Sequence, residues 1–188
     1  MNSLTPEERF FFANELEEDW ANDPAYFPKV FKPATGTWWD QLRGFARTQL
    51  AAGHCQLAVI MAHTAGDLAT ESALQSVLQD LGLGTATKPL YRLLPKPISL
   101  NDNRVREAWF DFTGDNPSAL PWWESFKKAR GLRNAVVHRG EPVDAPRATE
   151  ALDVVDQLIA YVTSVAEKTH NSPQQAHKGS PNGTAQSG

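Results

Sequence analysis

Apolar residues recur at three- and four-residue spacing along most of this chain, and strand-like alternation is convincing nowhere. Such spacing gathers apolar side chains on one face of an α-helix, whereas strands show a period of two. The pattern through Ala148, Leu152, Val155 and Ile159 is the cleanest example. We therefore predict an all-α fold. The expected helices span residues 37–50, 54–81, 101–112, 121–139 and 144–168, with a short turn of helix inside the proline-rich loop 82–100.

Residues that start and stop helices stand at the ends of these patterns. Asn101 or Asp102, and later Asp144, can accept hydrogen bonds from the first free backbone N–H groups of the helices that follow them. Gly140 can adopt the left-handed conformation that commonly ends a helix, just after the expected segment 121–139. The helix boundaries are therefore predicted by local chemistry as well as by periodicity.

Three regions of different composition divide the chain. Residues 1–36 begin with Thr5-Pro6-Glu7-Glu8, a capping-box sequence ahead of an aromatic stripe, and then become rich in proline. We interpret them as an N-terminal helical extension. Residues 37–168 hold the main helical domain, and residues 169–188 lack the apolar side chains needed for a core, so we predict a disordered C-terminal tail.

Composition narrows the class of protein. A chain of 188 residues suits one main domain with a self-sufficient core, and its single cysteine, Cys55, excludes an internal disulfide framework. The first residues have no basic stretch followed by an apolar run, and no apolar run is long enough to cross a bilayer. We expect a cytoplasmic protein that does not enter the membrane.

The candidate chemistry lies near the end of the helix expected at 121–139. Arg133, Asn134 and His138 stand there in the order Arg-Asn-x-x-x-His, and Arg133 follows Phe126 by seven residues, at the border of the apolar face. Residues 126–140 contain no acid, and on a chain of net charge −4 this basic stretch either contacts a few phosphates or is a solvated helix face. Its other cations, the candidate RNA-binding residues, are Lys127, Lys128, Arg130 and Arg139.

The arrangement of Arg133, Asn134 and His138 resembles the signature of the HEPN superfamily, in which a polar residue follows the arginine and a histidine comes shortly after. The resemblance covers about residues 54–166 and implies a HEPN-like helical bundle of about four core helices. It also implies a homodimer that cleaves RNA without a metal or other cofactor. Many such proteins are toxins or phage-defence effectors, so an antitoxin or regulatory protein is an expected partner.

Arginine and histidine suffice for this chemistry because the nucleophile is the substrate's own 2′-OH. An imidazole can exchange a proton with that hydroxyl or with the leaving 5′-oxygen, and a guanidinium can hold the scissile phosphate with two hydrogen bonds. Asn134 would orient the histidine or donate to a phosphate oxygen. The expected product is a 2′,3′-cyclic phosphate, and the catalytic residues expected are Arg133, Asn134 and His138.

Two acids on the preceding long helix are candidates to orient this site. Asp67 and Glu71 lie four residues apart at the edge of an apolar face, where an unpaired carboxylate would be costly. Either one could pair with Arg133 across the bundle or simply be exposed. His63, on the same helix, is predicted to be a surface histidine or one whose hydrogen bonds are satisfied.

A second interpretation needs no catalysis. Arg133 and His138 would then cap the end of their helix by bonding its last carbonyls, as basic residues often do. The chain would be a non-catalytic HEPN binding or scaffold module that acts through protein partners, with either Trp122 and Trp123 or the aromatic residues of the N-terminal extension on the binding surface. Metal chemistry has no support, because no group of residues shows the spacing of metal ligands.

Overall fold

The structure is a computed structural model that describes residues 36–171, and for residues 86–88 and 91 it describes the backbone only. Within these residues every regular element is a helix and no strand occurs, so the predicted all-α fold is confirmed. The predicted helical extension at 1–36 and most of the predicted tail at 169–188 lie outside the described residues.

Six α-helices follow one another in the described chain, and their bounds agree with those expected from the pattern to within a few residues. They are α3 (Trp38–Ala51), α4 (Cys55–Asp80), α5 (Thr87–Leu93), α6 (Asn103–Thr113), α7 (Trp123–Arg139) and α8 (Ala145–Asn171). The helix α8 extends three residues beyond the predicted end at 168. The proline-rich loop contains α5, the short helix predicted there.

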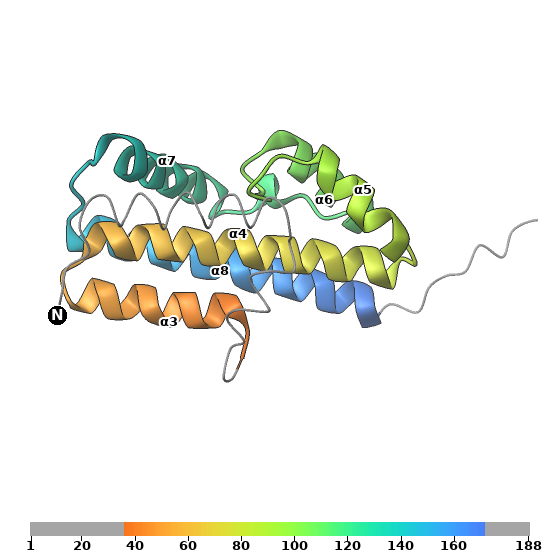
Figure 1. Cartoon of the computed structure of the whole chain (residues 1–188), viewed down its shortest axis with the longest axis horizontal. Coiled ribbons are helices and arrows are strands. Elements are labelled where there is room, and N and C mark those ends of the chain that lie inside the picture. The colour runs from red at the N-terminus through yellow and green to blue at the C-terminus, as the bar shows by residue number, and fades with distance from the viewer. Residues whose placement is uncertain (1–35, 172–188) are drawn as a thin grey trace, which may run out of the picture. The chain divides into compact units, whose positions relative to one another are not determined.

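The three helices α3, α4 and α8 lie side by side, and α7 and α6 cover α4 and α8 from the other side (Figure 1). The chain direction in α3 and α7 is opposite to that in α4 and α8. Because α4 is covered by α3, α8, α7 and α6, it is buried around much of its circumference, polar positions included. The end of α7 thereby lies beside the start of α4.

A close approach of α4 and α8 forms the centre of the core. Gly66 on α4 allows this approach, because a Cβ atom there would lie 3.1 Å from Leu158 Cδ2 and 3.2 Å from Val155 Cγ1. A second cluster of aromatic rings connects α6 and α7 to α8, and in it Trp109 Nε1 donates to the Tyr161 hydroxyl at 3.1 Å. The buried apolar side chains of both regions belong to one core.

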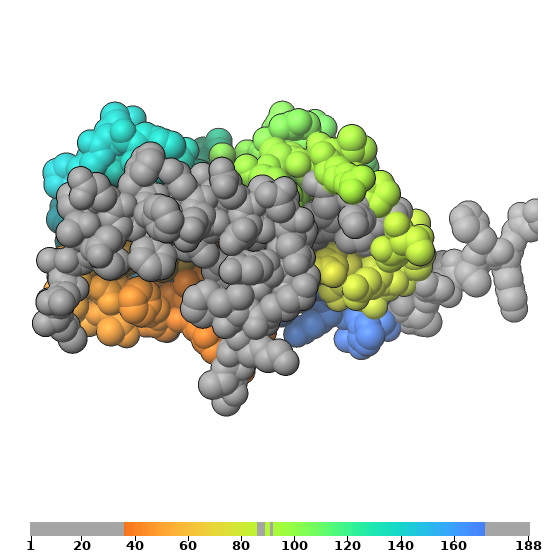
Figure 2. Space-filling view, viewed as in Figure 1, coloured from red at the N-terminus to blue at the C-terminus, as the bar shows by residue number. Residues whose placement is uncertain are grey.

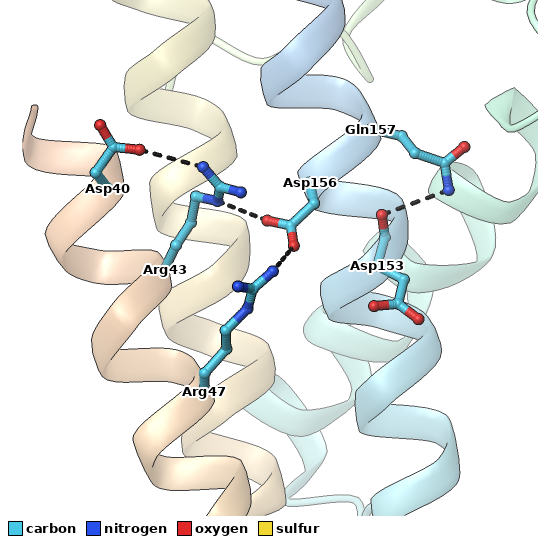
Figure 3. Close-up of polar contacts among 6 residues, drawn as sticks. All are labelled: Asp40, Arg43, Arg47, Asp153, Asp156 and Gln157. Atoms are coloured by element: carbon cyan, nitrogen blue, oxygen red, sulfur yellow. Dashed lines mark hydrogen bonds and ion pairs between the residues drawn. The ribbon is translucent and has the colours of Figure 1, made fainter.

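An ion-pair cluster joins α3 to α8 on the outer side of the bundle. Arg43 and Arg47 both reach Asp156, with Arg43 Nε donating to Asp156 Oδ1 at 2.6 Å (Figure 3). Asp40, at the start of α3, accepts a second bond from Arg43 at 3.1 Å. The cluster thus fixes α3 against α8 along the side chains that face solvent.

The predicted helix ends are confirmed in their hydrogen bonds. Asp102 accepts from the Arg104 N–H at 2.9 Å, and Asp144 accepts from the Arg147 N–H at 3.0 Å. Gly140 has a positive φ of 63°, so its backbone takes the left-handed conformation expected at the end of α7. Local sequence therefore determines where α6, α7 and α8 begin or end.

Candidate functional site

The end of α7 is held in place by backbone hydrogen bonds rather than by side-chain caps. The N–H of Gly140 bonds the carbonyl of Val136 at 3.0 Å, and the N–H of Glu141 bonds that of Ala135 at 3.3 Å. Gln56, in the first turn of α4, donates to the carbonyl of Glu141 at 3.1 Å. This contact ties the last turn of α7, which carries His138, to the start of α4.

Asn134 and His138 lie one helical turn apart on an exposed face of α7. His138 is exposed and no hydrogen bond to its side chain is found within residues 36–171, so a ligand can reach its imidazole. Arg133 Nη1 donates to Asn134 Oδ1 at 3.3 Å, which links the arginine to this face. Figure 2 shows α7 (cyan) at the surface, along one edge of the face in view.

Arg133 is half-buried at the border of the core, as its spacing from Phe126 predicted. Its Nε is fully buried and has no hydrogen-bond partner in the described part of the chain. Burial lowers the pKa of Arg133, the charge of Arg130 lowers it further, and the carboxylate of Asp67 opposes both effects. The guanidinium is therefore in an unfavourable environment that an additional anion would improve.

Asp67 is neither paired with Arg133 nor exposed, the two alternatives that the sequence left open for it. Arg130, one turn earlier on α7, donates from Nη1 to Asp67 Oδ2 at 2.9 Å, and only 12% of each of these side chains is exposed. Burial raises the pKa of Asp67, while Arg130 and a hydrogen bond with Ser99 lower it. Asp67 is thus committed to a buried ion pair, and Arg130 is not on the surface where a phosphate contact was expected.

Glu71, the other candidate acid, lies beside Lys96 in the loop before α6. Glu71 Oε1 and Lys96 Nζ are 3.8 Å apart, and burial raises the pKa of the Glu71 carboxyl against the opposing charge of Lys96. Asp67 and Glu71 therefore form ion pairs with Arg130 and Lys96, and neither acid pairs with Arg133, the partner proposed for one of them from the sequence.

His63 is not the surface histidine that was one of its two expected positions, and only in part the alternative, a histidine with satisfied hydrogen bonds. It is 2% exposed, its ring centroid is 6.1 Å from that of Phe126, and its Nε2 has no partner among the described residues. Burial, and then the charges of Arg130 and Arg133, lower the pKa of His63 from 6.5 to about 3, opposed by a hydrogen bond with the Ala129 backbone. The imidazole is therefore neutral at physiological pH.

The remaining basic residues of α7 do not form one surface. Lys127 forms a 2.7 Å ion pair with Glu124, and Arg139 contacts Glu141 at 3.3 Å. Lys128 lines a groove of about 410 Å³ between α7 and α8. Successive positions on a helix are separated by about 100°, so these side chains leave α7 in different directions. Lys127 shares the face of Asn134 and His138, at spacings of seven and eleven residues.

Residues 36–171 contain neither a metal-binding cluster nor a membrane-spanning helix. No group of three or more His, Cys, Asp or Glu side chains there is arranged to hold a metal ion. None of the helices in the same range has the length and apolar character of a membrane span.

Comparison with family models, with curated proteins and with solved structures found no match.

Proposed function

We propose that this chain is a metal-independent endoribonuclease of the HEPN type, with a HEPN-like arrangement of its helices and a homodimeric active form. The observation that carries the proposal is Arg133, a half-buried guanidinium with no acid bonded to it within the described chain, next to the exposed Asn134 and His138. Asp67 is the acid whose charge acts on Arg133, but its carboxylate is bonded to Arg130. A phosphodiester would supply the missing negative charge.

In the proposed reaction, Arg133 holds the scissile phosphate and offsets the charge that develops on it. His138 accepts the proton of the 2′-OH as that oxygen attacks phosphorus. The bond from phosphorus to the 5′-oxygen breaks, and the leaving oxygen takes up a proton from a second imidazole. A dimer that brings two copies of α7 to one cleft would provide that second histidine. The products are a 2′,3′-cyclic phosphate and a 5′-hydroxyl.

The test is incubation of a mixed RNA pool with the purified protein in EDTA, followed by mass analysis of the new ends. Cleavage to cyclic phosphates is expected, and Arg133→Ala and His138→Ala should each lower the rate by about 10²–10⁴-fold. Matched controls are Arg104→Ala on α6 and His170→Ala in the last turn of α8, since both residues are exposed and neither belongs to α7 or to the turn of α4 that contacts its end. An intact RNA pool, or equal rates in all four variants, would refute the proposal.

A binding module is the second candidate, favoured by the groove between α7 and α8. Apolar side chains of Ala129, Leu132 and Val154 line it, together with charged residues such as Lys128 and Glu150. This candidate predicts no RNA cleavage, and a cellular effect that survives Arg133→Ala but is lost on Lys128→Glu. The tryptophan surface expected from the sequence is not available for it, because Trp123 is 4% exposed and Trp122 is half-buried.

A further inference from the structure

Two buried nitrogen atoms on facing helices lack hydrogen-bond partners in the described chain, and they have complementary roles. One is Nε2 of His63 on α4, and the other is Nε of Arg133 on α7. A buried polar atom without a partner costs about 1–3 kcal/mol, so two of them in one region require a physical explanation.

The tautomer of His63 follows from its backbone contact. A hydrogen bond with the Ala129 backbone raises the pKa of His63, and Nε2 has no partner among the described residues, so we assign that bond to Nδ1–H. In a neutral imidazole with a proton on Nδ1, the Nε2 atom carries a lone pair and acts only as an acceptor. Arg133 Nε–H can act only as a donor.

The spacing of residues along α7 places Arg133 on the same side of that helix as the residues next to His63 of α4. Phe126, Ala129 and Arg133 follow one another at three- and four-residue spacing, so they share the face that α7 turns toward α4. The His63 ring lies beside this face, with its centroid 6.1 Å from that of Phe126, and the charge of Arg133 acts on it. Long side chains on a helix generally point back toward its N-terminus, which for Arg133 is the direction of Ala129, the residue whose backbone bonds His63.

We propose that His63 is a positioning residue for Arg133, through one bridging water molecule. The water donates to His63 Nε2 and accepts from Arg133 Nε–H, which gives each of these two unpartnered nitrogens a hydrogen bond. The bridge uses Nε–H and leaves the two Nη groups, one of which donates to Asn134 Oδ1, for other partners. In the role that rests on the proposed function, those two groups bind the scissile phosphate. His63 does not touch the RNA and takes no part in proton transfer.

The contact itself is tested without RNA. In ¹H–¹⁵N correlation spectra of the wild-type protein, His63 should show the tautomer protonated on Nδ1, and the Arg133 Nε–H signal should exchange slowly with water. The slow exchange should be lost in His63→Phe, which has no acceptor, and kept in His63→Gln, which has one. A proton on Nε2, or an Arg133 signal unaffected by His63→Phe, would overturn the proposal even if the protein cleaves RNA.

The consequence for catalysis is tested by the same two variants. A mispositioned catalytic group can lower a rate by about 10²-fold, so His63→Phe should reduce kcat by roughly 10–100-fold with little change in KM. His63→Gln should stay near the wild-type rate, and neither variant should move the pH profile of kcat. Equal rates for the two variants would overturn the positioning role. Absence of cleavage by the wild type would refute the proposed function and leave the spectroscopic result to decide the contact.

Discussion

Lowering the pH from 8 to 5 should destabilise the protein through His63 by an amount that the structure allows us to calculate. Burial holds the pKa of His63 at about 3 in the folded state, against 6.5 in the unfolded chain. The stabilisation from the neutral ring is complete above pH 6.5 and is lost as the pH falls toward 3, because only the unfolded chain gains the proton. At pH 5, about 1.5 pH units below the unfolded pKa, the loss is about 2 kcal/mol at roughly 1.4 kcal/mol per unit.

The assay is urea denaturation of the wild type and of His63→Gln at pH 8, 6 and 5. The difference in free energy of unfolding between the two proteins should fall by about 2 kcal/mol from pH 8 to 5, while titration of Asp67 and Glu71 cancels in the comparison. Val59→Ala, which changes a buried residue one turn earlier on α4, should lower the free energy of unfolding by the same amount relative to wild type at every pH. A constant difference between wild type and His63→Gln would show that the ring is accessible to protons and refute the burial argument.

Two further predictions concern the core around this residue. Asp67→Ala should cost about 3 kcal/mol in urea denaturation because Arg130 would remain buried without its anion, and the double variant Asp67→Leu with Arg130→Met should recover most of that loss. Gly66→Ala should cost about 1–3 kcal/mol, since the new methyl group would lie 3.1 Å from Leu158 Cδ2. Gly44→Ala, on α3 with open space around it, should instead stabilise the protein, and a cost there would contradict the packing argument.

The sequence predicted the helices well because their boundaries depend on neighbouring residues. Asp102 and Asp144 bond N–H groups two or three residues ahead, and Gly140 adopts its left-handed conformation within the chain's own last turn. Such contacts require no knowledge of how helices pack. The same locality explains why the border position of Arg133 was predicted correctly from its distance to Phe126.

The partner of each buried charge could not be predicted, because it depends on the register between α4 and α7. Arg130 and Arg133 are three residues apart and share a face, so periodicity alone cannot decide which of them reaches Asp67. The burial of His63 also results from helices on several sides of α4. The sequence contained one indication of this burial. The helix α4 carries apolar and small residues on all of its faces, which is typical of a buried helix.

Basic residues close together in sequence gave a misleading impression of one cationic surface. Lys127 and Lys128 are neighbours, yet one bonds Glu124 and the other lines the groove toward α8. Arg130, three residues on, is directed inward to Asp67. At about 100° per residue, Asn134 and His138 each lie within about 20° of the direction of Lys127, whereas Arg130 lies about 60° away, so Lys127, Asn134 and His138 are the set that geometry groups.

The distribution of charge between α4 and α7 is the reason for which we propose the nuclease ahead of the binding module. One buried carboxylate faces two guanidinium groups there, and the ion pair at 2.9 Å assigns it to Arg130. Arg133 is then half-buried beside another positive charge, and both burial and that charge disfavour its protonated form. A module that acts only through the groove on the other side of α7 has no use for a charge at this position. An enzyme that binds a phosphodiester does use this charge, because its ligand supplies the negative charge that no acid of the described chain supplies to Arg133 by a direct bond.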